Sequence, residues 1–204
     1  LAYPLPLPSP ETARTRLGIG EDAFMIACFG LATPEKRFHI SIPAFHRFHQ
    51  ERPHAILAVV GEVPEWYNLH QWVADRNLEG AVRMTGFVDM GTLADYLSAA
   101  DLCLNLRYPT MGETSASLLR ILGAGRATIV SDAGACAELP GDCCLKLAVG
   151  EGEEEALLEA MRRLADDHEE RRRLGENARR YVEKEHSPAL AAEAYARFVE
   201  ALIL

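Results

Sequence analysis

Residues 102–125 read LCLNLRYPTMGETSASLLRILGAG, a strand-like run followed by a loop and by a run of helix formers. Continuous apolar residues at 102–106 predict a buried strand, and residues 116–122 predict a helix. Thr114 and Ser115 stand where the N-cap of that helix belongs. Such a corner presents free backbone N–H groups and the positive end of a helix dipole, which together bind phosphate. The stretch therefore predicts an anion site at the helix N-terminus.

The same alternation of strand and helix continues on both sides of this stretch. Apolar runs that predict strands lie at residues 24–30, 55–60, 82–85, 127–130 and 145–147, with helical periodicity at 38–51, 64–76 and 92–99 between them. Strands that are apolar throughout are covered on both faces, and helical connections between them make a sheet parallel. We therefore predict an α/β fold, a doubly wound Rossmann-like parallel sheet of about six strands with helices on both faces.

The two ends of the chain differ from this middle part. Residues 1–10 alternate proline with apolar residues, which predicts an extended connector, and residues 12–18 predict a short helix that ends at a glycine. Beyond residue 153 the pattern is helical only. We assign residues 1–22 to a linker with a short lead-in, and residues 23–204 to one domain with a C-terminal helical tail.

The composition of the 204 residues is that of an ordinary globular protein, with 49% hydrophobic and 25% charged residues. A formal net charge of -9 argues against a nucleic-acid-binding surface, which needs a basic face. No apolar run approaches the roughly 20 residues of a membrane span. The five cysteines are an odd number without metal or redox spacing, so we expect free thiols and a cytoplasmic protein.

An anionic ligand of such an acidic chain needs a local cluster of cations, since salt screens the overall repulsion beyond roughly 8 Å. Lys36, Arg37 and Arg107 are the candidates, because each follows a predicted strand. The carboxyl ends of parallel strands meet at one edge of the sheet, where ligands bind. The alternative is that Lys36 is a solvated loop lysine and that Thr114 and Ser115 form an ordinary helix cap.

Other chemistries find less support in the sequence. His46 and His49 share a helix face but have no evident third ligand, so we predict no metal site. The pattern Gly-x-Gly-x-x-Gly is absent after the first strand, where only Gly30 occurs, and this disfavours a dinucleotide cofactor. Residues 168–180, HEERRRLGENARR, predict a solvated helix face with i,i+4 charge pairs. We therefore expect no cofactor.

Short motifs follow one another in a fixed order along the chain. They are PEK at residues 34–36, VVGE at 59–62, MTGFVD at 84–89, the strand that enters residues 108–125, and TIVSDAGACAELP at 128–140. A helical tail, LADDHEERRRLGENARRYVEKEHS, follows at 164–187. In this order the motifs resemble the C-terminal domain of retaining GT-B-type glycosyltransferases, and most closely the bacterial "group 1" family. The resemblance extends over residues 24–202.

The resemblance implies a domain that binds a nucleotide-diphosphate sugar, with UDP, GDP or ADP as its nucleotide. Lys36, in the PEK motif, would contact the diphosphate and would be catalytic together with Glu113. The residues expected around the diphosphate and the sugar are Gly30, Lys36, Gly112, Glu113, Thr114, Ser115 and Ala116, joined by Arg37 and Arg107 because these adjoin the same loops. The residues expected around the base and the ribose are Gly61, Glu62, Gly86, Phe87, Val88 and Arg120.

Three positions depart from the family pattern. Leu31 stands where the family has an arginine aimed at the diphosphate. Gly112 and Arg120 stand where it has two glutamates, and Glu113 is one position away from the first of these. The family's usual ribose contact therefore does not carry over directly to Arg120. We interpret the chain as a member of a divergent subgroup.

These observations predict the donor-binding half of a retaining, metal-independent glycosyltransferase, whose acceptor-binding N-terminal domain is missing from this chain. The isolated domain is then expected to transfer no sugar, and any membrane contact would run through the missing domain. The alternatives on the same fold are a non-catalytic nucleotide-binding or interaction module, and a GT-B-type nucleotide-sugar epimerase or phosphorylase.

Overall fold

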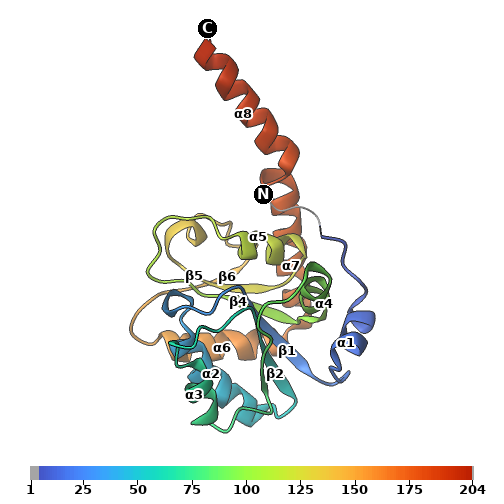
Figure 1. Ribbon diagram of the computed structural model, residues 1–204, viewed down its shortest axis with the longest axis vertical. Helices are drawn as coiled ribbons and strands as arrows, with labels where there is room; N and C mark the ends of the chain where they lie inside the picture. Colours follow the sequence, from blue (N-terminus) through green and yellow to red (C-terminus); the bar gives the residue numbers. More distant parts are fainter. Residues whose placement is uncertain (1–4, 204) are drawn as a thin grey trace.

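The apolar runs form one parallel sheet in the computed structural model, which describes residues 5–203. The strands are β1 (Phe24–Phe29), β2 (Ala55–Val60), β3 (Val82–Met84), β4 (Leu102–Asn105), β5 (Thr128–Ser131) and β6 (Leu145–Leu147). Their order across the sheet is β3-β2-β1-β4-β5-β6, and each neighbouring pair is parallel (Figure 1). This is the strand order of a Rossmann-type fold, so the predicted doubly wound sheet is confirmed.

The pattern of contacts along β1 explains why the strands are apolar throughout. Ile26 and Cys28 belong to the hydrophobic cluster on one face of the sheet. Met25, Ala27 and Phe29 belong to the cluster on the opposite face. All of these side chains are buried. Because helices cover both faces, a polar side chain in the middle of this strand would be buried without water.

Helices cover both faces of the sheet (Figure 1). They are α1 (Pro10–Leu17), α2 (Phe38–Glu51), α3 (Leu69–Ala74), α4 (Met90–Ala99), α5 (Ala116–Gly123), α6 (Glu153–Asp166), α7 (His168–Glu185) and α8 (Pro188–Ile203), with short 3₁₀ turns η1 (Pro34–Lys36) and η2 (Gly134–Cys136). One face is covered by α2, α3 and α6, and the other by α1, α4 and α5. Helix α7 packs against α5 and α6, and α8 extends away from the domain. Among the described residues, no helix combines the length and the apolar character that a membrane crossing requires.

The helix predicted at residues 64–76 is shorter than expected. Helix α3 begins only at Leu69, and tight turns precede it: the Tyr67 N–H donates to the Pro64 carbonyl (2.9 Å), and the Leu69 N–H to the Tyr67 carbonyl (2.7 Å). Trp66, within the range predicted to be helical, lies before α3 and is 66% exposed. These short-range bonds replace the i to i−4 bonds of a helix, so the prediction from apolar periodicity was wrong at its start.

The described part of the predicted linker, residues 5–22, packs on the domain. Leu5 and Leu7 contact the hydrophobic cluster that α1 and α4 form with the sheet. The Ser98 hydroxyl of α4 donates to the Pro8 carbonyl (2.7 Å). This segment therefore lies against α4 and does not extend from the domain as a separate connector. The first four positions of the predicted linker lie outside the described residues.

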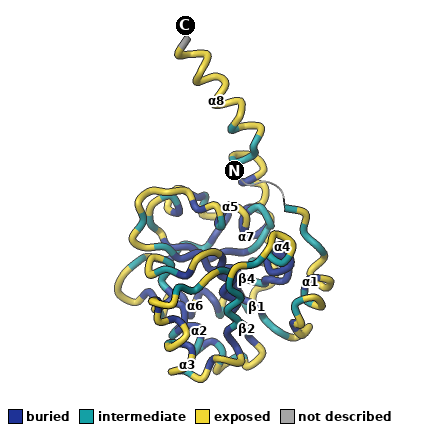
Figure 2. The backbone as a smooth tube through the Cα atoms, in the orientation of Figure 1, coloured by how far each residue is buried: buried dark blue, intermediate teal, exposed yellow. Residues whose placement is uncertain are grey.

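Large apolar side chains remain exposed in two places. One is α8, most of whose described residues are exposed (Figure 2); its exposed apolar residues are Leu190, Tyr195, Phe198, Val199 and Leu202. The other comprises the loops that follow β1 to β4 and the start of α4, with Leu31, Trp66, Phe87, Met90, Tyr108 and Met111. Exposed apolar side chains that gather in this way mark surfaces where a ligand or a partner binds.

Candidate functional site

The carboxyl edge of the sheet is where the fold positions a ligand. The strand order reverses between β1 and β4, and in such sheets a crevice forms outside the carboxyl ends at the reversal. The loops after β1, β2, β3 and β4 lie together on this side, at the left of Figure 1. The exposed apolar side chains of these loops lie on the same side. The candidate site is therefore built from four loops that are distant in sequence.

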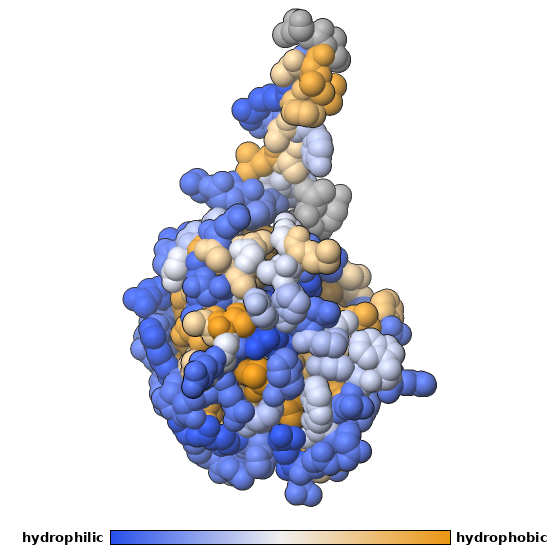
Figure 3. All heavy atoms as spheres, turned by 90° about the vertical axis from the view of Figure 1, so that its left-hand side faces the viewer, coloured by the Kyte–Doolittle hydropathy of each residue, from blue (hydrophilic) through white to orange (hydrophobic). Residues whose placement is uncertain are grey.

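A pocket of about 620 Å³ opens at this edge. Its walls come from the ends of β1 and β2, from the loop between β3 and α4, from α4 and from the first turns of α5. Its large apolar residues include Leu31, Phe87, Met90, Leu93 and Leu97, its polar ones are Glu62, Asp89, Ser117 and Arg120, and Phe29, Gly30, Val60, Gly61 and Val88 also line it. The structure thus gathers the predicted base and ribose residues, except Gly86, around one space. Figure 3 faces this side and shows apolar residues among hydrophilic ones.

Glycine at position 61 lets the ends of β1 and β2 meet at the wall of the pocket. Gly61 has a φ of 149°, and a Cβ there would lie 2.6 Å from the carbonyl carbon of Gly30. The Gly61 N–H donates to the Thr85 hydroxyl (3.3 Å), and Gly61 forms a β-bridge with Gly86. Gly86 therefore does not line the pocket itself, but its β-bridge connects it to Gly61, which does.

Lys36 reaches the end of β1 from the turn η1. Its ammonium group donates to the Phe29 carbonyl and lies 2.9 Å from the place that a Cβ on Gly30 would take. Burial is the main cause that lowers the pKa of Lys36 to about 8. Lys36 is therefore half-buried beside the pocket wall and still cationic at neutral pH, which contradicts the alternative of a solvated loop lysine.

Arg37 does not offer a free charge to the pocket. Its guanidinium donates to both carboxylate oxygens of Glu153, the first residue of α6, with an Nε to Oε1 distance of 2.7 Å. The Glu153 side chain is 1% exposed. The same guanidinium lies over the Tyr108 ring, 5.5 Å from its centre. The structure therefore does not support the prediction that Arg37 supplies a cation for a diphosphate, because a buried carboxylate already neutralises it.

Arg107 and Glu113 form an ion pair across the loop that follows β4. The Glu113 carboxylate also accepts the Met111 N–H (2.8 Å) and the Thr110 hydroxyl (3.1 Å). Backbone N–H groups, followed by Arg107, lower the pKa of Glu113 to about 2. Glu113 is thus an ionised hydrogen-bond acceptor at neutral pH, unsuited to donate a proton. Neither residue of this pair lines the pocket, and the catalytic role expected of Glu113 stays a prediction.

Ser115 is the N-cap of α5, in the place that the sequence predicted. Its hydroxyl accepts a backbone N–H of the first turn (3.2 Å). Thr114 and Ala116 on either side are exposed, and Gly112 enters the turn with a φ of 81°. Of residues 112–117, Ser117 alone lines the pocket. The N-terminus of α5 therefore borders the pocket, while the loop before it lies outside.

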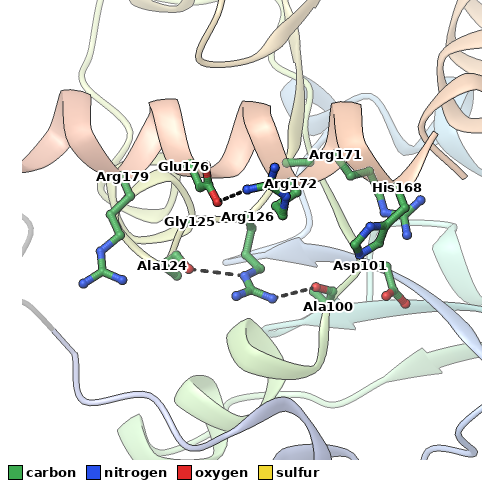
Figure 4. Close-up of a pocket in the computed structure, with 11 residues that line it drawn as sticks. Ala100, Asp101, Ala124, Gly125, Arg126, His168, Arg171, Arg172, Glu176 and Arg179 are labelled. Carbon is green, nitrogen blue, oxygen red and sulfur yellow. Dashed lines mark hydrogen bonds and ion pairs between the residues drawn. The ribbon is translucent and has the colours of Figure 1, made fainter.

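A second hollow, of about 340 Å³, lies at the amino edge of the sheet below α7 (Figure 4). Arg126 stands in it and donates to the carbonyls of Ala124 (3.2 Å) and Ala100 (3.3 Å), the C-caps of α5 and α4. Arg172 is paired with Glu176 (2.5 Å), one of the i,i+4 pairs predicted for this helix face. These cations cap helix C-termini or neutralise neighbours, so we assign this hollow to the stability of the fold.

The donors at the carboxyl edge suit an anion. They are the ammonium of Lys36, the guanidinium of Arg120, the Ser117 hydroxyl and the N–H groups of the first turn of α5. A metal ion would need several convergent acceptors. Within residues 5–203, histidine, cysteine, aspartate and glutamate side chains form no group of three or more that could hold a metal.

Two polar residues of this edge were missed from the sequence. Ser117 lies within the helix predicted at residues 116–122; in the structure it stands in the first turn of α5 and lines the pocket. Asn105, the last residue of β4, is 6% exposed, and its amide nitrogen has no partner among the described residues. Asn105 borders a small cavity together with Lys36. The sequence signal that points to it is a polar residue at the end of the apolar run LCLN.

Comparison with known proteins gives a family match over most of the chain. The model of the family described as glycosyl transferases group 1 matches residues 9–181. The lipopolysaccharide core biosynthesis glycosyltransferase LpsD of Rhizobium meliloti (strain 1021) is 29% identical over 189 residues. That alignment covers 92% of this chain and 52% of LpsD, so the chain spans about half the length of this relative.

Solved structures share the fold. The crystal structure of Anabaena Alr3699/HepE in complex with UDP and glucose aligns with a TM-score of 0.81 at 19% identity, over 94% of this chain and 51% of that one. The C-terminal domain of a group 1 family glycosyl transferase, LpcC, from Francisella tularensis aligns with a TM-score of 0.77 at 17% identity, over 91% of this chain and 96% of that domain. These alignments show that the chain shares the fold of both structures.

Proposed function

We propose that this chain, which belongs to the glycosyl transferases group 1 family, is the donor-binding half of a retaining, metal-independent glycosyltransferase. The observation that carries the proposal is the pocket at the reversal of strand order, bordered by Gly30, Gly61 and the N-terminus of α5. Lys36 adjoins it at Gly30. A space with apolar walls and cationic or N–H donors suits a ligand with a ring system at one end and an anionic group at the other.

The proposed donor is a nucleotide-diphosphate sugar. The volume of about 620 Å³ lies within the range of roughly 300–1,000 Å³ that is usual for small-molecule sites. Leu31, Phe87 and Met90 offer the base an apolar wall. The structural relative HepE is known with UDP and glucose, which makes UDP the first nucleotide to test, followed by GDP and ADP.

In the proposed reaction the bond between the anomeric carbon of the sugar and the diphosphate breaks, and an acceptor hydroxyl forms a new bond to that carbon. The hydroxyl proton is released to the departing diphosphate, on which negative charge grows as its bond to the sugar breaks. Lys36 and the N–H groups at the start of α5 would stabilise this charge. Glu113, ionised in its loop, would accept a hydrogen bond from a sugar hydroxyl. Because the protein itself supplies the compensating charge, the proposal requires no divalent cation.

An acceptor-binding half, supplied by the rest of a longer protein, would complete the enzyme. The chain spans 52% of LpsD, and the exposed apolar side chains of α8 and of the carboxyl-edge loops are surfaces that such a half would cover. We expect the chain alone to bind UDP-glucose but to transfer no sugar to an added glycan acceptor. Chromatography of the reaction products is the measurement. Formation of a glycoside above the level of a heat-treated sample would contradict the claim of a missing half.

We place the protein in the cytoplasm. Its cysteines, Cys28, Cys103, Cys136, Cys143 and Cys144, are all buried free thiols. Burial raises the pKa of Cys28 to about 12, so this thiol is unreactive at neutral pH. Free thiols of this kind are typical of a reducing compartment.

Replacing Lys36 by alanine is expected to weaken UDP binding by about tenfold or more, because a hydrogen bond between charged groups contributes roughly 1.5–3 kcal/mol. Titration calorimetry at pH 7.5 measures the effect. Lys184→Ala, which removes a lysine of α7 with an 82% exposed side chain, is the matched control and should bind UDP as the parent does. An unchanged dissociation constant for Lys36→Ala would exclude the proposed role of Lys36.

The affinity of the parent chain for UDP should also fall as the pH rises above about 8. Lys36 has a pKa of about 8, so it is protonated below that pH and loses its charge above it. The terminal phosphate of UDP, with a pKa of about 6, is already ionised and contributes no further change. We expect the affinity to begin to fall between pH 7 and 8, where Lys36 starts to lose its proton, to fall further above pH 8, and to show no such decline in Lys36→Ala. An affinity of the parent that stays constant to pH 9.5 would contradict this account.

A non-catalytic nucleotide-binding module on the same fold is the second candidate. Leu31 leaves one wall of the pocket without a cation, and Glu113 neutralises Arg107 within its own loop. A thermal-shift panel separates the two functions, since a ligand at 100 times its dissociation constant stabilises by about 2.7 kcal/mol. If the pocket binds a sugar donor, one nucleotide sugar should raise the melting temperature of the chain more than the same nucleotide without the sugar does. Equal shifts with and without the sugar would favour the module.

A further inference from the structure

Arg120 stands at the pocket as a cation without a carboxylate partner. It is exposed and lines the pocket from α5. Among residues 5–203 it forms no ion pair, whereas Arg37 is held by Glu153 and Arg107 is held by its own loop. Of the arginines that the sequence placed near the ligand, Arg120 alone keeps its charge available in the pocket.

The carboxylates near Arg120 do not take up this charge. Asp89 lines the same pocket but is the N-cap of α4, where it accepts the N–H (2.9 Å) and the hydroxyl (3.2 Å) of Thr92. Glu183 borders a neighbouring hollow that Arg120 also lines, and Glu183 is paired with Arg179 (2.9 Å). The remaining carboxylate of the pocket, Glu62, forms no ion pair among the described residues. The pocket therefore presents an unneutralised guanidinium.

The chemistry of a guanidinium favours phosphate over ribose. It has only hydrogen-bond donors and a permanent charge, and it binds phosphate oxygens through two parallel bonds. Ribose hydroxyls can donate hydrogen bonds only to an acceptor, and the guanidinium of Arg120 has no acceptor atom. Ser117 lies three residues earlier on the same face of α5, in the turn where N–H groups and the helix dipole also attract anions. The α5 side of the pocket is thus its anion-binding side.

We propose that Arg120 binds the diphosphate of the donor and not its ribose, an inference that rests on the function proposed above. Lys36, which adjoins Gly30, and Arg120 then act on one diphosphate from two separate elements, η1 and α5. This supplies the second cation that Leu31 cannot provide. Arg120 therefore determines selectivity for the phosphate part of the ligand.

The test compares UDP, UMP and uridine, or the corresponding guanine or adenine series if the parent chain prefers GDP or ADP. We expect Arg120→Ala to weaken UDP binding about tenfold and to leave uridine binding unchanged. Arg120→Lys should recover part of the loss, since it keeps the charge without the planar fork. Arg173→Ala is the matched control, because it removes an arginine of α7 whose side chain is 68% exposed. Melting temperatures of all variants check that they are folded.

The outcomes separate this inference from the proposed function. Equal losses for uridine and UDP in Arg120→Ala would overturn the inference, because the contact would then lie on the nucleoside. Unchanged binding of both ligands would overturn it as well. A folded parent chain that binds none of UDP, GDP and ADP would instead overturn the proposed function, and this inference would fall with it.

Discussion

Replacing Glu153 by alanine is expected to lower the free energy of unfolding by about 3–5 kcal/mol, the usual cost of removing one partner of a buried ion pair. The Glu153 side chain is 1% exposed and that of Arg37 is 11% exposed. Glu153 accepts two bonds from this guanidinium and also the N–H of Gly150 (3.2 Å). Its loss would leave the Arg37 charge buried without a partner, at the point where α2 and α6 begin.

Urea unfolding of the variant and the parent measures this effect. Glu154→Ala is the control, because it removes a carboxylate from the same turn of α6 that forms no ion pair among the described residues. A double variant, Arg37→Met with Glu153→Leu, should regain much of the stability, since neither charge is then buried. A loss below 1 kcal/mol for Glu153→Ala would show that the pair does not hold α2 and α6 together.

Replacing Gly61 by alanine is expected to cost about 2–5 kcal/mol and to abolish nucleotide binding. The φ of 149° is one that residues with a Cβ rarely adopt, and the new Cβ would stand 2.6 Å from the carbonyl carbon of Gly30. Both atoms are at the ends of central strands, so neither can shift without opening the sheet. The wall of the pocket would move with them.

Denaturant unfolding and calorimetry with UDP test this prediction together. Gly80→Ala is the matched control, because a Cβ at Gly80 would meet no heavy atom within 4 Å. We expect it to change stability by less than about 1 kcal/mol and to leave binding intact. A Gly61→Ala protein that remains as stable as the parent and binds UDP equally well would show that the close approach of β1 and β2 is not needed for the site.

The fold was predictable because strands that are buried on both faces of a sheet appear in the sequence as continuous apolar runs. β1 and β2 are apolar at every position. A strand with one face in water would instead alternate apolar and polar residues. The start of α3 was not predictable from periodicity, since a turn at Pro64 replaced the first helical bonds. Local bonding of this kind leaves the spacing of apolar residues unchanged.

The sequence predicts the parts of the candidate site whose position follows from backbone geometry. It does not predict the parts whose charge depends on a partner distant in sequence. Gly30 and Gly61 follow parallel strands, so their meeting follows from the fold. Arg37 also follows such a strand, but its charge is taken by Glu153, 116 residues further along the chain. No local pattern reports that pairing. Arg120 was named from a motif position, and only the structure shows that its charge is free within the pocket.

The central claim, that the pocket at the carboxyl edge binds a nucleotide, is tested most directly by following the backbone amide signals of the chain during a titration with UDP, and with GDP and ADP in parallel. We predict that one nucleotide shifts the signals of residues 30–31, 61–62, 87–88 and 117–120 most strongly and saturably. Shifts that gather instead around Arg126 and α7, or no shifts at millimolar concentrations of all three nucleotides, would contradict the account.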